Sequence, residues 1–169
     1  MVVKVAFQKV LILVTFIVLS FLNLGTSDCP SNSYTIPPVL GSAYSCVTLV
    51  EASHYFTQAE LVCNNQSGHL LSIPNGYVNT IIADLIKDAT GTTHNYWIGV
   101  TNMVGGVWRN VDDGSNATFF NWDSGYPHNG SQSSCVYMLS NGLWRSISCY
   151  PTTAYHLCTI PGIGETDSA

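Results

Sequence analysis

The residues best suited to chemistry lie in a long polar stretch, residues 110–134, which contains Asp112, Asp113 and Asp123. Carboxylate oxygens are the ligands that calcium prefers, so these three side chains are one candidate for a cation site. Aspartate is also common in turns and at solvent-facing loop tips, where its side chain bonds to nearby backbone. We favour this second arrangement, and the sequence predicts no metal cofactor.

Zinc is the other metal to consider, because the chain has five histidines, His54, His69, His94, His128 and His156. No two of them have the helical i, i+4 spacing, and the six cysteines form no Cys-x-x-Cys pair. Zinc sites usually show one of these patterns. We therefore expect ordinary histidines at the surface or half-buried.

Enzymatic motifs are missing from the sequence. It has no Gly-x-Ser-x-Gly, no His-Glu-x-x-His and no phosphate-binding glycine loop. Asp112 and Asp113 are adjacent in the chain and need not converge on one substrate. We expect a binding protein rather than an enzyme.

The charge balance excludes nucleic acid as a partner. The chain has five basic and ten acidic side chains, and Lys4 and Lys9 lie in the amino-terminal segment discussed next. Without that segment the chain is strongly acidic, whereas phosphate binding needs a basic surface.

Residues 1–27 have the pattern of a secretory signal peptide. An uncharged apolar run from Val10 to Leu24 follows the two lysines, and the small residues Gly25-Thr26-Ser27 come next. The run is shorter than the roughly 20 residues that span a bilayer, so we expect no membrane anchor. The prediction is a secreted, extracellular protein with one domain over residues 28–160 and a frayed polar tail over residues 161–169.

All six cysteines follow this segment, and an even number in a secreted chain predicts disulfides. The spacing alone leaves their connectivity open. Sequons at Asn65, Asn116 and Asn129 fit a secreted glycoprotein.

Two helices are expected in the first half of the domain. Thr57 and Glu60 form a capping-box pattern, which predicts a helix over residues 58–65 that Thr57 caps. Apolar residues at three- and four-residue spacing predict a second helix from Val78 that ends at Gly91. The apolar positions are Val78, Ile81, Ile82, Leu85 and Ala89.

Short apolar runs separated by Gly, Asn, Asp and Ser predict strands over residues 44–50, 70–73, 96–100, 106–109, 135–139, 142–147 and 155–160. Helices followed by strands indicate an α+β fold with helices packed on a mostly antiparallel sheet. The long loop region 110–134 is expected to be functional.

Several short motifs follow one another along the chain in an order that is typical of one domain family. Cys29-Pro30, Gly68 to Ile73, Trp97-Ile98-Gly99, Asn121-Trp122 and the frame from Cys135 through Trp144 to Cys158 are the main ones. In this order and spacing the chain resembles the C-type lectin-like domain in its long form, most closely the secreted nematode members.

The resemblance implies a disulfide pairing of Cys29 with Cys46, Cys63 with Cys158, and Cys135 with Cys149. We also expect the tryptophans to fill the core beneath the loops rather than stack on a sugar. They are Trp97, Trp108, Trp122 and Trp144.

Sugar-binding members of that family hold one calcium ion with oxygen ligands from a Glu-Pro-Asn or Gln-Pro-Asp loop and from an Asn-Asp pair after the tryptophan. Here the corresponding positions are Tyr126, His128, Arg145 and Ser146, and none carries a carboxylate. We expect ligand binding without calcium, and a cis peptide bond before Pro127 by analogy with those members.

The function that the resemblance implies is calcium-independent recognition of a carbohydrate or glycoconjugate, in a setting such as innate defence. The candidate ligand-binding residues are Tyr126, His128, Asn129 and Arg145. If a glycan binds, it is expected to be acidic or stacked on Tyr126, with Arg145 as the anchor. The alternative is a protein-binding module that uses the same loop platform and has no sugar activity.

Overall fold

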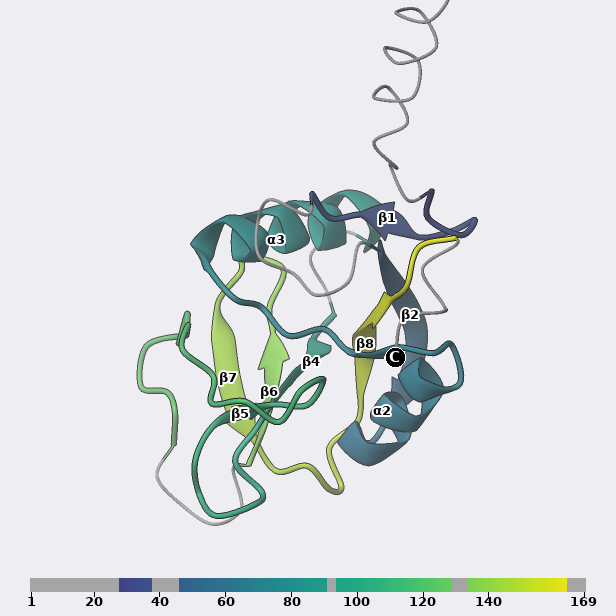
Figure 1. Ribbon diagram of the computed structural model, residues 1–169. Helices are drawn as coiled ribbons and strands as arrows, with labels where there is room; N and C mark the ends of the chain where they lie inside the picture. The colour runs from purple at the N-terminus through teal and green to yellow at the C-terminus, as the bar shows by residue number, and fades with distance from the viewer. Residues whose placement is uncertain (1–27, 38–45, 91–93, 129–133, 164–169) are drawn as a thin grey trace, which may run out of the picture.

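The structure of the chain is a computed structural model that describes residues 28–37, 46–90, 94–128 and 134–163 (Figure 1). The predicted signal peptide, the sequon at Asn129 and residues 164–169 of the predicted tail lie outside these ranges. Within them, no helix has both the length and the apolar character needed to cross a bilayer.

The described residues fold as two helices and a mixed sheet. The helices are α2 (Phe56–Asn64) and α3 (Gly76–Thr90). The strands are β1 (Tyr34–Thr35), β2 (Cys46–His54), β3 (His69–Leu70), β4 (Tyr96–Thr101), β5 (Arg109–Asn110), β6 (Cys135–Met138), β7 (Trp144–Ile147) and β8 (Ala154–Ile160).

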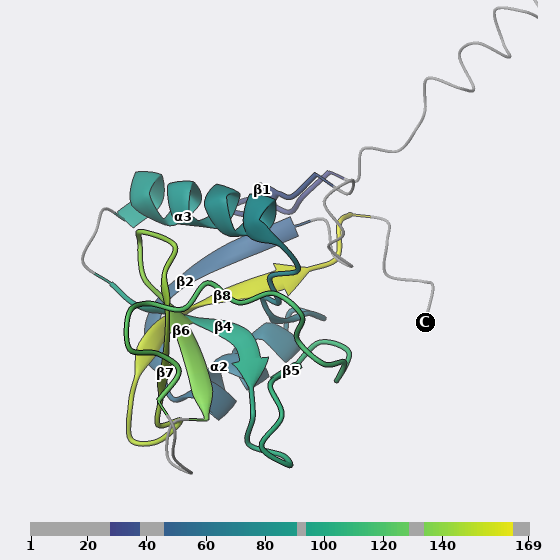
Figure 2. The same ribbon diagram turned by 90° about the vertical axis from the view of Figure 1, so that its left-hand side faces the viewer.

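The sheet has the order β1-β2-β8-β4-β6-β7, with β3 beside β8 and β5 beside β4. All pairings are antiparallel except that of β4 with β8, which is parallel. Helices α3 and α2 lie on opposite sides of the strands, above and below them in Figure 2. The predicted α+β class is confirmed, with a sheet that is mixed at its centre.

Helix α2 begins earlier than the sequence predicted. Its N-cap is Tyr55, which makes no side-chain cap hydrogen bond, so the predicted capping box of Thr57 and Glu60 is wrong. The Glu60 carboxylate instead binds across to β3: it lies 2.6 Å from His69 Nδ1 and accepts the Leu70 N–H at 2.8 Å. The buried Phe56 fixes the helix start, because its ring packs at 5.6 Å from that of Trp97.

Helix α3 is capped by Asn75, whose side-chain oxygen accepts the backbone N–H of Tyr77 and of Val78. This Asx cap places the helix start at Gly76, two residues before the apolar pattern begins. Val78, Ile82 and Ile86 form its buried face. Two residues of the predicted apolar face, Ile81 and Ala89, are exposed.

Most predicted strands are present with shifted ends. Strand β1 was not predicted. Of the predicted strand 70–73, only Leu70 lies in a strand, β3, which begins at His69. Residues 106–108 are not a strand. The start of the predicted tail is tied to the domain, because Ile163 N–H donates to the Asp28 carbonyl at 2.8 Å.

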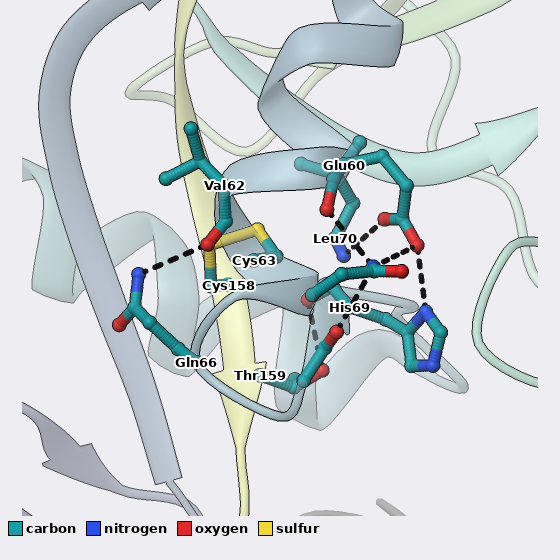
Figure 3. Close-up of a disulfide and its surroundings, with 10 residues drawn as sticks. Glu60, Val62, Cys63, Gln66, His69, Leu70, Cys158 and Thr159 are labelled. Atoms are coloured by element: carbon teal, nitrogen blue, oxygen red, sulfur yellow. Dashed lines mark hydrogen bonds and ion pairs between the residues drawn. A yellow bond between two sulfur atoms is a disulfide. The ribbon is translucent and has the colours of Figure 1, made fainter.

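Three disulfides connect the elements: Cys29–Cys46, Cys63–Cys158 and Cys135–Cys149. These are the pairs that the family resemblance implies. Cys63–Cys158 joins α2 to β8, and in Figure 3 it lies beside the network of Glu60, His69 and Leu70. The first and last parts of the domain are thereby held together.

Gly99 lies at the centre of the fold, where three segments meet. Its N–H donates to the Leu71 carbonyl at 2.7 Å and its carbonyl accepts the Val111 N–H at 2.9 Å. A Cβ atom here would lie 2.2 Å from the Leu70 carbonyl oxygen, so only glycine fits. This contact positions the start of the loop region on the sheet.

Candidate ligand-binding site

Strand β7 alternates buried and half-buried residues, as expected for a strand with one face on the core. Trp144 and Ser146 are fully buried, whereas Arg145 points to the other face. Register with β6 places Arg145 opposite Tyr137. The alternation thus exposes a single cation beside the loop region.

Residues 121–128 dock against β7 through backbone hydrogen bonds. Trp144 N–H donates to the Asn121 carbonyl, and Asp123 N–H donates to the Trp144 carbonyl, both at 2.8 Å. His128 N–H donates to the Ser146 hydroxyl, also at 2.8 Å. These three bonds align the loop beside the strand and bring Asp123 next to Arg145.

Asp123 and Arg145 form an ion pair across this junction. Arg145 Nε lies 2.7 Å from Asp123 Oδ2, and Ser124 N–H donates to Oδ1 of the same carboxylate. The hydrogen bond from Arg145 holds the pKa of the Asp123 carboxyl below its usual value, and the Ser124 N–H acts in the same direction. The same bond, together with one to Tyr137, raises the pKa of Arg145.

Two aromatic side chains lie next to this ion pair. The Arg145 guanidinium carbon is 5.5 Å from the centroid of the Tyr126 ring, within the range of a cation–π contact. The Tyr126 ring is 4.3 Å from the His128 ring. The bond between Tyr126 and Pro127 is cis, as predicted. Tyr126, His128 and Arg145 are therefore brought together, while Asn129 lies outside the described residues.

An aromatic cluster supports the loop from below. Trp122 lies 5.2 Å from Trp108, 5.5 Å from Phe120 and 6.0 Å from Trp144, measured between ring centroids. Trp144 and Trp97 are fully buried, and Trp108 and Trp122 are partly buried against the core. The tryptophans fill the core beneath the loops, as predicted.

The three aspartates of the loop region have separate partners. Asp112 accepts a hydrogen bond from the Ser72 hydroxyl, Asp113 accepts the Ser115 N–H, and Asp123 binds Arg145. The hydrogen bonds at Ser115 lower the pKa of Asp113. The sequence analysis did not identify Asp123 as the partner of Arg145. The only indication in the sequence was that the two side chains carry opposite charges.

Among the described residues, the one group of three possible metal ligands is Cys63, Cys158 and His156, and its two cysteines form a disulfide. His156 is fully buried, which contradicts the prediction of surface or half-buried histidines. The reason is its register in β8, where it pairs with Trp97 of β4 and Val50 of β2 in the middle of the sheet.

The lectin C-type domain model matches residues 52–160. The chain belongs to the lectin C-type domain family. It is 34% identical to rat lithostathine over 128 residues, which cover 72% of this chain and 77% of the relative.

Solved structures share this fold. Human lithostathine superposes with a TM-score of 0.69 at 23% identity, covering 80% of this chain and 92% of that chain. A calcium-independent type II antifreeze protein superposes with a TM-score of 0.66 at 22% identity, covering 79% of this chain and 95% of that chain. The relatives in this family are C-type lectin-like binding proteins rather than enzymes.

Proposed function

We propose that the loop site recognises neutral glycans without calcium. The observation that carries this proposal is the ion pair of Asp123 and Arg145, 2.7 Å apart beside the Tyr126 ring. In a calcium-dependent site, a divalent cation links the loop to the strand that follows the tryptophan. Here the Arg145 guanidinium, on β7, makes that link to the Asp123 carboxylate of the loop.

The residues at the expected ligand positions do not fit calcium. Calcium takes six to eight oxygen ligands. A guanidinium has no acceptor atom, and its positive charge repels a cation. The Ser146 hydroxyl is buried and accepts the His128 N–H. A solved structure with the same fold is described as calcium-independent, so the fold does not require the ion.

The chemistry of the site favours an uncharged sugar over an acidic one. The charge of Arg145 is balanced by Asp123, so an acidic ligand would meet a neutral pair rather than a free cation. Tyr126 offers a half-exposed ring of the kind that packs against the apolar face of a sugar. The carboxylate and guanidinium beside that ring accept from and donate to hydroxyl groups.

A glycan array with and without chelator tests the proposal. Binding of neutral glycans is expected to be equal under both conditions. Tyr126→Ala should weaken it about tenfold, because one aromatic contact and its buried area are lost. Arg145→Met should also weaken binding, since it removes the hydrogen-bond donors and leaves Asp123 without its partner.

Tyr34→Ala is the matched control, because Tyr34 is an exposed tyrosine on β1, away from the loop. This variant should bind as the unchanged protein does. Loss of all binding on chelation would refute calcium independence. Unchanged binding in both Tyr126→Ala and Arg145→Met would refute the site.

We also propose that the protein is secreted as a glycoprotein and acts outside the cell, in innate defence. The sequence of residues 1–27 and the three disulfides support secretion. Asn65 and Asn116 are both exposed, so an oligosaccharide could be attached there. Mass spectrometry of the protein collected from culture medium tests both points: an intact amino-terminal segment or unmodified asparagines would contradict them.

A protein partner is the second candidate, and an exposed apolar loop tip favours it. Met103, Val104 and Val107, between β4 and β5, have exposed fractions of 46%, 77% and 45%. Apolar side chains gathered at a tip are typical of interaction sites. A pull-down with Val104→Ser beside the unchanged protein tests this candidate: a captured protein that the variant no longer retains would favour it over the glycan.

A further inference from the structure

A second polar site lies between α3 and the turn that joins β6 to β7. This turn reaches α3 in both ribbon views (Figures 1 and 2). Between them is an open cleft of about 480 Å³, within the range of about 300 to 1,000 Å³ that holds small ligands. Its lining residues include Asn79, Thr80, Asp84, Lys87, Asn121 and Asn141. None of them belongs to the loop site formed by Asp123, Tyr126, His128 and Arg145.

The amide groups at the back of the cleft are fixed in place by the fold. Asn79 is buried: its oxygen accepts the indole N–H of Trp144 at 2.8 Å, and its nitrogen donates to the Gly142 carbonyl. The Asn121 nitrogen donates to that carbonyl as well, at 2.7 Å. Gly142 has a φ of +84°, and a Cβ atom there would lie 3.0 Å from the Asn79 nitrogen. Glycine at the turn thus lets both amides converge on one carbonyl.

These bonds leave hydrogen-bonding capacity on several side chains. Because the Asn121 nitrogen is engaged at Gly142, its side-chain oxygen remains an acceptor. Asn141 uses its oxygen to accept the Leu143 N–H, so its amide nitrogen remains a donor. Thr80 donates its hydroxyl to the Gly76 carbonyl and keeps its lone pairs. A ligand would meet groups whose orientation is already set, which lowers the entropic cost of binding.

Asp84 and Lys87 complete the lining with opposite charges. They lie three positions apart on α3, and both are exposed. In the ranges that the structure covers, ion pairs join only Glu60 to His69 and Asp123 to Arg145, so neither Asp84 nor Lys87 is paired. The cleft therefore offers a strong acceptor and a strong donor at zero net charge.

We propose that this cleft binds a neutral, polyhydroxylated ligand of the size of one sugar unit. Several hydroxyl groups can each accept from Lys87 or Asn141 and donate to Asp84, Asn121 or Thr80. A charged ligand is disfavoured, because one of the two charges would repel it. The proposal is independent of the loop site, since the two sites share no residue.

An NMR titration of the disulfide-bonded protein with methyl glycosides of glucose, galactose, mannose and N-acetylglucosamine tests the cleft. At least one is expected to shift the backbone amides of residues 79–87 and 139–143, with a weak, millimolar affinity. Asp84→Ala should weaken that binding about tenfold, because it removes a charged hydrogen-bond acceptor. Asp88→Ala is the matched control, since Asp88 is an exposed aspartate of α3 that does not line the cleft.

The position of the shifts separates this proposal from the one for the loop. Tyr126→Ala should leave the cleft shifts unchanged, and Asp84→Ala should leave any shifts of residues 123–128 unchanged. Shifts confined to the loop would overturn the cleft while leaving the loop site standing. The cleft proposal would also be overturned if glycine betaine, a zwitterion, shifted these backbone amides and none of the four glycosides did. It would likewise be overturned if no glycoside shifted them at about 100 mM.

Discussion

His156 should make the fold sensitive to acid. Its side chain is fully buried, and neither ring nitrogen makes a hydrogen bond of good geometry. Its ring lies 5.3 Å from that of His54, whose Nδ1 is also buried without a partner. Burial, and secondarily the neighbouring His54, lowers the pKa of His156 from 6.5 to about 4, while the Ala52 carbonyl acts weakly in the opposite direction.

The sign and size of the effect follow from this shift. Between pH 6.5 and about 4, the unfolded chain binds a proton at His156 that the folded protein does not bind. The free energy of unfolding therefore falls as the pH falls through this window, and this group adds no pH dependence above it. At 1.36 kcal/mol per pKa unit, the total loss is about 3 kcal/mol. That is a large part of the stability of a domain of this size.

Urea unfolding at several pH values between 7.5 and 4, with the disulfides intact, measures the effect. The fluorescence of the buried Trp97 and Trp144 reports the transition. Carboxylates contribute to acid sensitivity in every variant, so the informative quantity is the difference from His156→Leu. This variant should lose about 3 kcal/mol less than the unchanged protein over the window.

His94→Leu is the control, because it removes an exposed histidine and leaves the buried His156 in place. It should retain the acid sensitivity of the unchanged protein. If the curves of the unchanged protein and His156→Leu run parallel from pH 7.5 to 4, the burial argument for His156 is wrong.

Three further variants, with Gly76→Ala as a control for the second, test the packing by urea unfolding. Replacing both Cys63 and Cys158 by alanine should cost about 4 to 5 kcal/mol in the chain-entropy model, because the bridge spans 95 residues; a loss below about 1 kcal/mol would contradict it. Gly99→Ala should cost more than about 3 kcal/mol, because its Cβ would lie 2.2 Å from a backbone oxygen, whereas Gly76→Ala, with its nearest contact at 3.8 Å, should be close to neutral. Trp144→Phe removes the indole N–H that donates to a buried amide of α3, and should cost about 1 to 3 kcal/mol; no change would show that water replaces the bond.

The fold was predictable from the sequence where local pattern and tertiary packing agree. The apolar spacing around Val78 and Ile82 located α3, and the runs 135–139 and 142–147 located β6 and β7. The start of α2 was not predictable, because burial of Phe56 outweighs the capping pattern of Thr57. Strand β1 consists of two residues that pair only with β2, so no periodicity marks it.

The site was predictable only in part, for a similar reason. The family resemblance placed Tyr126, His128 and Arg145 at one site, and the structure brings them together. It did not identify Asp123 as the partner of Arg145, since the two are 22 positions apart and meet only because the loop docks on β7. The cleft beneath α3 depends on Asn79 and Gly142, which are 63 positions apart.

The ion pair of Asp123 and Arg145 determines local geometry more than global stability. Partly exposed ion pairs add little to the free energy of folding. The loop keeps its place on β7 through backbone bonds at Asn121 and Asp123, and through the bond from His128 to the buried Ser146 hydroxyl. Substitution of Arg145 should therefore change ligand binding and leave the melting temperature nearly unchanged. Because of this separation, a loss of binding in Arg145→Met can be assigned to the site rather than to unfolding.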